Sequence, residues 1–338
     1  MKEETILLSH GAGGRRTHDL ISRLFLKHFS NSLLDELDDS AVLPIGADAE
    51  NMVFTTDSYV VNPLFFPGGD IGRLAVCGTV NDLAVMGAEP KYLSCGFIIE
   101  EGFRVGELEK ILESMREALR EAGVAIVTGD TKVVEKGAAD GVFINTSGVG
   151  LLRAGVGMGI KMIEPGDAIL VNGTLGDHGL AVMAARESFP FKTAVRSDCA
   201  PLNGLVSSLL GASPGIRFMR DLTRGGLATV LNEIAESAKL GVELDEKAIP
   251  ISESAFRFCE ILGLDPLYLA NEGKMAVVVP DVDAGKVLSA ARAHPLGKDA
   301  AIIGKVTGRH PGRVTISTGV GGARILDMLA GDPLPRIC

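Results

Sequence analysis

The sequence predicts an α+β (α/β) protein of two domains, on three observations. Strand-like and helix-like segments alternate along both halves of the chain. The length of 338 residues suits two domains, since one domain usually takes about 100–200 residues. Hydrophobic residues make up 46% and charged residues 22% of the chain, which provides side chains for a core and excludes general disorder.

Apolar spacing and capping residues predict the elements of the first half. In order, they are a helix from Thr17, a strand at 52–56, a helix from Asp70 to near Gly87, a strand at 91–99, a helix at 107–122 ended by Gly123, and strands at 125–128 and 142–145. The helix from Thr17 should carry Leu20, Ile21, Leu24 and Phe25 on one face.

A glycine-rich stretch at 148–159, whose only charge is Arg153, predicts the domain boundary. We expect an N-terminal domain at 1–155, a C-terminal domain at 156–330 and a mobile tail at 331–338. The second domain should contain strands at 168–171, 275–279, 301–306 and 313–316, and a helix marked by Leu227, Val230, Leu231 and Ile234. Two prolines bias the tail toward extended backbone.

Composition excludes several classes of protein. The net charge of −10 argues against a nucleic-acid partner. The N-terminus is acidic and lacks the apolar stretch of a signal peptide, and no window approaches the ~18 apolar residues that span a membrane. The 5 cysteines are dispersed and form no C-x-x-C pair, so neither a disulfide framework nor a zinc site is indicated. We expect a cytoplasmic protein with no membrane partner.

Acidic residues at strand ends and beside glycine suggest a nucleotide site. The candidates are Asp48, Asp57, Asn81 with Asp82, and Asp130 with Thr131 and Lys132. Several carboxylates brought together repel one another unless they hold cations, and Mg²⁺ takes a few carboxylates while phosphate oxygens and water complete its octahedron. Lys132 would add a positive charge toward the phosphates. Taken singly, residues of this kind more often cap turns or lie solvated, and no P-loop run exists.

Four further features each allow two interpretations. The loop at 9–16, which contains His10, could close over an anion or be a flexible arm. The run at 221–226 could bind an anion at a helix N-terminus or simply cap that helix. Glu272, between Asn271 and Gly273, could be a general base or part of a turn. Cys338 could be a reactive thiol on a swinging tail or a chance terminal residue.

Motifs along essentially the whole chain carry a family resemblance. They are TTDSYVV at 55–61, FPGGDIG at 66–72, GTVNDLA at 78–84, TGDTKVV at 128–134, DHG at 177–179, DLTRGG at 221–226, NEG at 271–273 and PRIC at 335–338. Together they resemble the HypE family, the carbamoyl dehydratases of nickel–iron hydrogenase assembly. The acidic motifs are shared with aminoimidazole ribonucleotide synthetase and selenophosphate synthetase, and the ending PRIC narrows the resemblance.

The resemblance implies an aminoimidazole ribonucleotide synthetase-like fold, with the N-terminal domains of a homodimer sharing a β-barrel. It implies ATP and Mg²⁺ near the acidic cluster and the dimer interface. The carbamoyltransferase HypF would place a carbamoyl group on the Cys338 sulfur. ATP would activate the amide oxygen as phosphate, dehydration would leave a thiocyanate, and the cyano group would pass to iron on a HypC–HypD complex.

It also implies residue roles. Asp48, Asp57, Asp82 and Asp130 would position Mg²⁺ and the triphosphate, with Asn81 and Thr131 beside the nucleotide. In the chemical step, Lys132 would offset phosphoryl charge, Glu272 would take a proton from nitrogen, Asn271 would orient the amide, Arg153 would serve the substrate tail and His10 the closing loop.

Two alternatives remain at the level of sequence. A selenophosphate synthetase-like phosphotransferase shares the acidic motifs, but it carries a reactive Cys or selenocysteine with a Lys in its N-terminal loop, where this chain reads Ser9-His10-Gly11-Ala12. A non-catalytic thiol carrier would hold a group on Cys338 and use ATP only as a conformational switch.

Overall fold

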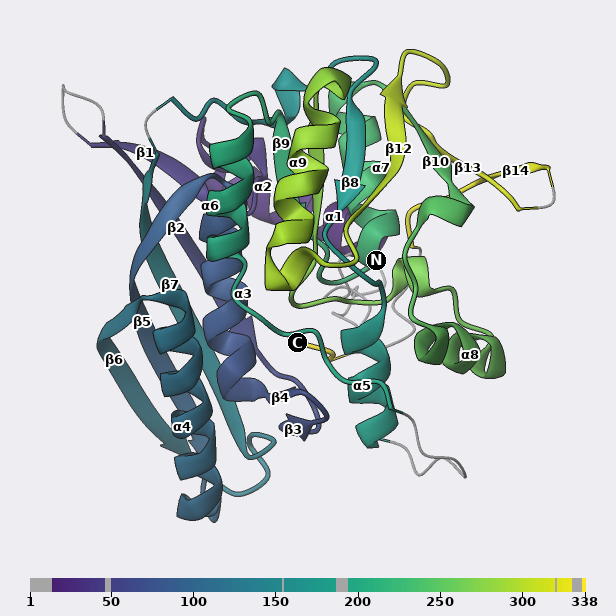
Figure 1. Ribbon diagram of the computed structural model, residues 1–338. Coiled ribbons are helices and arrows are strands. Elements are labelled where there is room, and N and C mark those ends of the chain that lie inside the picture. Colours follow the sequence, from purple (N-terminus) through teal and green to yellow (C-terminus); the bar gives the residue numbers. More distant parts are fainter. Residues whose placement is uncertain (1–13, 46–49, 154, 187–193, 320, 330–335) are drawn as a thin grey trace, which may run out of the picture.

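Two β-sheets and the helices packed on them make up the described residues of the computed structural model, which are 14–45, 50–153, 155–186, 194–319, 321–329 and 336–338. Figure 1 shows the sheet of the first half on the left, the second sheet on the right, and helix α3 between them. This arrangement confirms the predicted mixture of helices and strands in two units. Within these residues, no helix is long and apolar enough to cross a membrane.

The first sheet has five strands in the order β1-β2-β7-β5-β6. They are β1 Ala41–Ile45, β2 Glu50–Tyr59, β5 Ala88–Glu100, β6 Ala125–Val134 and β7 Val142–Leu152. Adjacent strands run antiparallel except β5 and β6, which are parallel. The four strands predicted here are confirmed. All are longer than predicted, because their apolar runs continue into polar, partly exposed residues.

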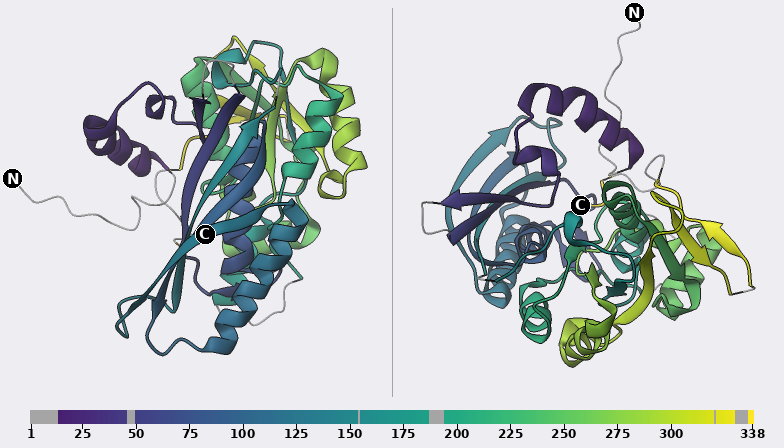
Figure 2. Two further views of the ribbon diagram at one scale, coloured as in Figure 1. Left: turned by 90° about the vertical axis from the view of Figure 1, so that its left-hand side faces the viewer. Right: turned by 90° about the horizontal axis from the view of Figure 1, so that it is seen from above.

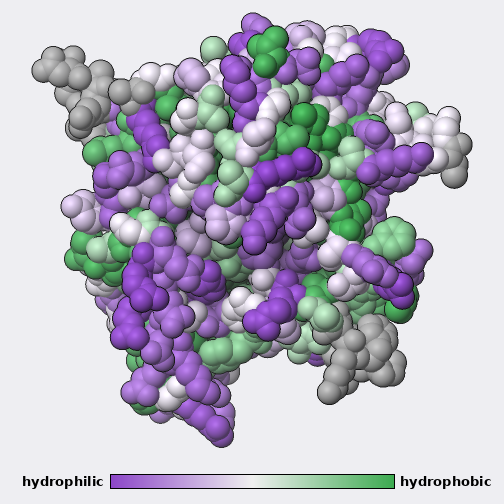
Figure 3. Space-filling view, viewed as in Figure 1, coloured by the Kyte–Doolittle hydropathy of each residue, from purple (hydrophilic) through white to green (hydrophobic). Residues whose placement is uncertain are grey.

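Helices α3 and α4 cover one face of this sheet. Helix α3, Ile71–Val85, begins as predicted at Asp70, whose side chain accepts hydrogen bonds from two backbone N–H groups of the first turn. Helix α4, Val105–Ala122, ends as predicted at Gly123, whose φ of +71° is in the left-handed region. Helix α3 is buried along nearly all of its length, whereas α4 turns a polar face outward, visible at the lower left of Figure 3.

The second sheet has seven strands in the order β14-β13-β10-β12-β8-β11-β9. They are β8 Ala168–Val171, β9 Phe218–Asp221, β10 Gly241–Asp245, β11 Met275–Val279, β12 Ala301–Thr307, β13 Val314–Ser317 and β14 Ala323–Ile325. All adjacent pairs are antiparallel except β10 and β13. The four predicted strands are present, whereas β9, β10 and β14 were not predicted.

Helices cover both faces of the second sheet, because successive side chains of a strand point to opposite faces. Ile169 and Val171 pack into one core with α7, Gly226–Ala238, which is the helix predicted from its apolar face. Ala168 and Leu170 pack into another core with α6, Asn203–Ala212, and α9, Asp281–Ala293. The second half is therefore a sandwich of helices, sheet and helices.

The two halves share a core through α3. Ala84 and Val85 of that helix pack with Leu202 and Leu205 of the second half. The first sheet ends at Leu152 and the second begins at Ala168. These limits support the proposed division into domains 1–155 and 156–330.

The N-terminal helix differs from the prediction. The chain forms α1 from Arg15 to Leu20, a π-helical turn η2 at Ile21–Phe25, and α2 at Leu26–Phe29, with Gly14 rather than Thr17 at the start. Leu24 and Phe25 are 47% and 48% exposed, because this segment projects from the body in Figure 2.

Two further helices, α5 and α8, and several short elements complete the fold. They are η3 Leu34–Glu36, β3 Phe65–Phe66, β4 Gly69–Asp70, η4 Ile160–Met162, α5 Asp177–Arg186, η5 Glu246–Ala248, α8 Glu253–Leu262, η6 Pro266–Tyr268 and η7 Pro295–Gly297.

Candidate active site

The last three residues of the chain lie inside the molecule, between the two halves (Figure 1). The N–H of Val60 donates to a terminal carboxylate oxygen of Cys338 over 3.1 Å, and the N–H of Asn62 donates to the carbonyl of Arg336 over 3.3 Å. This is antiparallel pairing between the tail and the segment that follows β2. Ile337 is 3% exposed, and Cys338 is half-buried against the hydrophobic core between α3, α4 and the first sheet. The sequence left the resting position of the tail open, and here it is docked.

Arg336 anchors the docked tail by both its side chain and its backbone. Its guanidinium donates to the carbonyl of Val60 over 3.0 Å, pairs with Asp140, and lies 5.9 Å from the centre of the Phe143 ring. A guanidinium over an aromatic face is a favourable cation–π arrangement. The carbonyl of Arg336 in turn accepts from the side chain of Arg186 at the end of α5.

His178, in the first turn of α5, contacts the tail one residue before the terminal cysteine. Its Nε2 lies 2.8 Å from the carbonyl oxygen of Ile337, and its Nδ1 lies 2.8 Å from the hydroxyl of Ser197. The ring is fully buried and meets Phe66 edge-on at 5.3 Å. Burial lowers the pKa of this imidazole, so it is neutral at neutral pH.

Glu272 lies beside the docked tail and is 3% exposed. Its Oε1 is 3.9 Å from Nε2 of His178 and accepts no hydrogen bond from any described residue. Because the imidazole is neutral, this contact is not an ion pair. Burial first, and then the negative charges of Asp221, Asp198 and Asp57, raise the pKa of Glu272 well above its ordinary value. A buried carboxylate without a donor is a strong base for its residue type.

Further acids, one buried and two half-buried, extend from Glu272 across the junction of the two halves. Asp57 lies on β2, Asp82 on α3 and Asp221 at the end of β9. Burial raises the pKa of all three, and the charges of neighbouring acids raise those of Asp82 and Asp221 further. Arg224, in the loop before α7, opposes this effect at Asp57 and Glu272. The cluster can accept positive charge.

The donor set suits Mg²⁺ only in part. Carboxylate oxygens are the ligands that Mg²⁺ prefers. Among the described residues, however, no group of three or more His, Cys, Asp or Glu side chains is close enough to hold a metal ion. A magnesium ion bound here would therefore need phosphate or water oxygens to complete its coordination.

Comparison with known proteins bears directly on this arrangement. The N-terminal domain of AIR synthase related proteins matches residues 37–152, and their C-terminal domain matches residues 164–317. Over 340 aligned residues, the chain is 52% identical to the carbamoyl dehydratase HypE of Cupriavidus necator, covering 100% of this chain and 96% of that protein. The chain belongs to the HypE family.

Solved structures of HypE proteins agree with the fold. A HypE crystallised in complex with ATP is 49% identical to this chain, has a TM-score of 0.83, and the match covers 99% of this chain and 100% of the other. A HypE–HypF complex contains a chain that is 51% identical with a TM-score of 0.87, covering 92% of this chain and 99% of that one. The expected aminoimidazole ribonucleotide synthetase-like fold is thereby confirmed.

Within this HypE-family fold, two of the predicted site residues, Cys338 and Glu272, lie at the docked tail. Asp82 accepts a hydrogen bond from the hydroxyl of Thr55 over 2.9 Å, on the strand that carries Asp57. The negative charge of Asp57 contributes to the raised pKa of both Glu272 and Asp82, although these acids come from different halves.

Asp130, Thr131 and Lys132 lie elsewhere in the chain, on the edge strand β6. Asp57 pairs with Thr146, Thr146 with Cys95, and Cys95 with Gly129, so β6 is three strand spacings, about 14 Å, from β2. Asp130 and Lys132 alternate with Gly129 and therefore point to the opposite face of the sheet from Asp57. Both are exposed and pair with each other.

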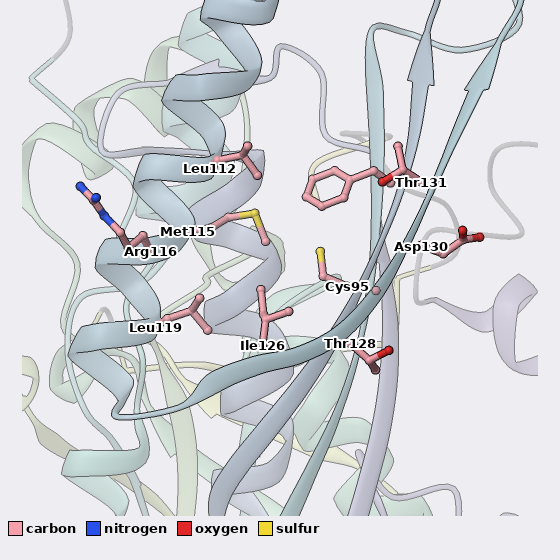
Figure 4. Close-up of a pocket in the computed structure, with 11 residues that line it drawn as sticks. Cys95, Leu112, Met115, Arg116, Leu119, Ile126, Thr128, Asp130 and Thr131 are labelled. Atoms are coloured by element: carbon pink, nitrogen blue, oxygen red, sulfur yellow. The ribbon is translucent and has the colours of Figure 1, made fainter.

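Thr131 faces the side of β6 that α4 covers. A cavity of about 540 Å³ opens there between α4 and the strands β5 and β6 (Figure 4). Its lining is Cys95, Phe97, Leu112, Met115, Arg116, Leu119, Ile126, Thr128, Gly129, Asp130 and Thr131. The carboxylate of Asp130 points away from the cavity in Figure 4. This cavity is separate from the docked tail, which lies beyond the end of β2.

The two predicted asparagines hydrogen-bond to backbone groups in this structure, and their predicted contacts with nucleotide and amide stay predictions. The side chain of Asn81 donates to the carbonyls of Ala200 and Glu272 and accepts from the N–H of Leu202 at 2.7–3.2 Å. Asn81 therefore ties α3 to the second half. Its amide is fully committed to backbone, because the side chain is 1% exposed.

Asn271 is committed in the same way. Its side chain accepts from the N–H of Gly176 over 2.8 Å and donates to the carbonyls of Leu222 and Leu269. These bonds join the loop before α5, which carries His178, to the segment that carries Glu272. Asn271 therefore positions both residues, and its predicted role in orienting the amide stays a prediction.

Arg153 is not brought to the tail. It follows the far end of β7 from Phe143, which contacts Arg336, and it donates to the hydroxyl of Ser207 over 2.8 Å. His10 and Asp48 lie outside the described residues, so their predicted roles stay predictions.

Sequence reasoning missed the residues that support the site from the second half. His178 and Asp221 stood in quoted motifs without a role in catalysis. Asp198 accepts hydrogen bonds from the N–H groups of Glu272 and Gly273, each over 3.1 Å, and a third bond from Lys274. No local pattern marks Asp198 or Ser197. The partners of Asp198 are more than 70 residues away, and the partner of Ser197 is His178 on α5.

Proposed function

We propose that this chain dehydrates an S-carbamoyl group on its own Cys338 to a thiocyanate at the expense of ATP, supplying the cyano ligand for the iron of nickel–iron hydrogenase. The observation that carries the proposal is the docking of the terminal cysteine segment beside Glu272, a buried carboxylate whose Oε1 has no donor among the described residues. A base held without a donor near the tail that carries the reacting group would suit removal of a proton from nitrogen.

The reaction balances without an oxidant or reductant. The carbamoyl group –S–CO–NH₂ cannot lose oxide, so the γ-phosphoryl group of ATP is transferred to the amide oxygen and ADP leaves. Loss of two protons from nitrogen and of phosphate from carbon then gives –S–C≡N. The sum is ATP and a carbamoylated chain giving ADP, phosphate and a cyanated chain.

The buried acids would face the triphosphate from both halves. Asp57 and Asp82 are our candidates to hold Mg²⁺ together with phosphate oxygens, and the family resemblance adds Asp48 and Asp130. The bound ion would neutralise charge that develops on the phosphates. Raised pKa values at Asp57 and Asp82 support a cation in this place, since a nearby positive charge stabilises their ionised forms.

We further propose that the chain works as a homodimer through the outer face of its first sheet. Phe54, Tyr92 and Ile98 on this face are 39%, 53% and 45% exposed. Lys132 pairs with Ile98 in the sheet and lies on the same face. We infer that a second copy covers this face, and that Lys132 offsets phosphoryl charge at the nucleotide held by that copy.

The proposed reaction needs two partners. HypF would carbamoylate Cys338, in keeping with the HypE–HypF complex, one chain of which resembles this one. A HypC–HypD complex would accept the cyano group. Both steps require the tail to leave its docked position, and we place all of them in the cytoplasm, where ATP is available and thiols stay reduced.

The direct test follows the mass of the chain and the fate of ATP together. The carbamoylated chain, mixed with ATP and Mg²⁺, is expected to lose one water in intact-mass spectrometry while one ADP and one phosphate form per chain. The Cys338→Ala chain should bind ATP but show neither change. ATP consumption by the carbamoylated chain without the mass loss would overturn the proposal in favour of a non-catalytic thiol carrier.

A further inference from the structure

His178 uses both of its ring nitrogens in the docked state. A carbonyl oxygen only accepts hydrogen bonds, so Nε2 of His178 must carry the proton that bonds to Ile337. The neutral ring then accepts at Nδ1, and the hydroxyl of Ser197 donates to it over 2.8 Å. The carbonyl of Ile337 thereby selects the Nε2–H tautomer, and the hydroxyl of Ser197 supports it by donating to Nδ1.

The ring and its neighbours are held in place by bonds of their own. The hydroxyl oxygen of Ser197 accepts from the N–H of Cys199 over 3.1 Å, and the N–H of Ser197 donates to the carbonyl of Pro67 over 2.7 Å. On the other side, Asp198 fixes the backbone of Glu272. His178 and Glu272 are therefore presented to the tail from two anchored segments.

The proton on Nε2 has a second acceptor within reach. Oε1 of Glu272 lies 3.9 Å away, too far for a hydrogen bond but close enough that a small rotation of either side chain would make one. While the tail is docked, the proton is committed to Ile337. That commitment leaves Oε1 of Glu272 without a donor among the residues described.

We propose that His178 is a positioning residue that couples docking of the tail to the state of Glu272: its Nε2–H holds the Ile337 carbonyl when Cys338 is in place and turns to Glu272 when the tail leaves. This inference rests on the proposed function for its meaning. Oε1 of Glu272 then lacks a donor only while the tail is docked. When the tail has left to meet a partner, Oε1 accepts a hydrogen bond from Nε2–H of His178.

The first experiment measures docking in the full-length chain. The rate at which iodoacetamide alkylates Cys338, followed by peptide mass spectrometry, reports the fraction of undocked tail. His178→Phe keeps the ring volume but removes the donor, and we expect about a tenfold faster rate, the population change that corresponds to one buried hydrogen bond. His178→Gln retains an N–H donor and should stay within about twofold of the native rate. Equal rates in all three chains, or equal acceleration in both variants, would overturn the proposal.

The second experiment measures Glu272 itself. Infrared titration follows its protonated C=O band, assigned by the loss of that band in Glu272→Gln, before and after a bulky maleimide on Cys338 prevents docking. We expect the maleimide to lower the titration midpoint by about one pH unit more in the native chain than in His178→Phe. Equal shifts in the two chains would show that His178 does not turn to Glu272.

Charged neighbours do not confuse this comparison. Asp221, Asp198, Asp57 and Arg224 act on Glu272 in both chains alike, and Asp198 and Arg186 act on His178 in the native chain, where the ring is neutral. Neither readout needs ATP or dehydration. A native chain that docks its tail as described but never dehydrates it would therefore refute the proposed function and leave the role of His178 in docking standing.

Discussion

At the scale of single residues, the chemistry of the site depends on one unsatisfied carboxylate. Native proteins rarely leave a buried polar atom without a partner, and such an atom calls for an explanation. Here Asp198 and Asn271 satisfy the surrounding backbone, yet Oε1 of Glu272 has no donor in the described structure. The molecule thus stabilises the loop while leaving the carboxylate that we propose as the base without a donor.

Replacing Glu272 should stop dehydration after carbamoylation. We expect Glu272→Gln to lower the single-turnover rate by about 10²–10⁴-fold, the usual contribution of a positioned base. Glu272→Asp keeps the carboxylate and should lose less. The measurement is cyanated chain formed per unit time, by rapid quench and intact mass. Normal turnover in Glu272→Gln would remove this residue from the role of base.

The pH dependence of the native rate follows from the raised pKa of Glu272. A base acts only when it is ionised, so the rate should rise with pH through a midpoint well above the ordinary pKa of a glutamate, 4.5. Burial is the main cause of the raised pKa, and the nearby acids add to it. The check is a profile of single-turnover rate against pH. A rate that is already at its plateau at pH 5 would contradict a raised pKa in the docked state.

At the scale of elements, helix α3 joins the two halves and carries the acids between them. Its neighbouring residues Asn81 and Asp82 have opposite effects on stability. Asn81 satisfies three backbone groups of the second half, whereas Asp82 is a carboxylate held among other buried acids. The two side chains therefore allow binding and folding to be separated by mutation.

Asn81→Ala should destabilise the fold because it leaves the buried N–H of Leu202 without a partner. We expect a loss of about 3 kcal/mol in the free energy of unfolding, since a single unsatisfied buried group costs about 1–3 kcal/mol and two carbonyls also lose a donor. The control Asn203→Ala removes one bond, to the carbonyl of Ala122, and should lose less. Urea denaturation measures the free energy of unfolding of both variants. Equal losses would contradict the role of Asn81 in linking α3 to the second half.

Asp82→Asn should have the reverse effect on folding. Burial, and then Asp221, Asp57 and Asp39, raise the pKa of Asp82 well above 3.8. Ionising it therefore destabilises the folded chain as the pH rises above the unfolded pKa toward the folded one. At neutral pH the uncharged variant should be more stable by at least about 1 kcal/mol, the value of one pKa unit, yet bind Mg²⁺ and ATP more weakly. Calorimetry measures both, and unchanged affinity would assign Asp82 a structural role only.

Local signals predicted α3 and the central strands well, and they failed where partners are distant. The cap at Asp70 and the stop at Gly123 are set within one helical turn, so the sequence shows them directly. The roles of Asn81 and Asn271 depend on backbone groups brought from other segments of the fold. The π-helical turn at 21–25 interrupts a helix whose apolar spacing looked regular, and nothing in that spacing marks it.

At the scale of the whole molecule, the acidic motifs divide between two faces of the first sheet. The sequence grouped Asp57, Asp82 and Asp130 because they stand at strand ends, beside glycine or on a helix turn, and it added Lys132 as a positive charge toward the phosphates. Only strand register decides the face, and a register can be read only when every pairing is known. Asp57 lies on the side of α3, whereas Asp130 and Lys132 lie on the outer side, with Phe54 and Tyr92.

If Lys132 acts on the nucleotide of a second copy, two inactive chains should restore each other. Lys132→Ala lacks the lysine, and Cys338→Ala lacks the sulfur to be carbamoylated. A mixed dimer contains one complete site, made of Cys338 from one copy and Lys132 from the other, so an equimolar mixture should recover about a quarter of native activity per total chain if copies exchange at random. Size-exclusion chromatography with light scattering is the control that measures whether dimers form. Differently tagged copies verify that the chains exchange. If the mixture is then as inactive as each variant alone, Lys132 acts on the nucleotide of its own chain, and the edge strand β6 would have to move toward β2.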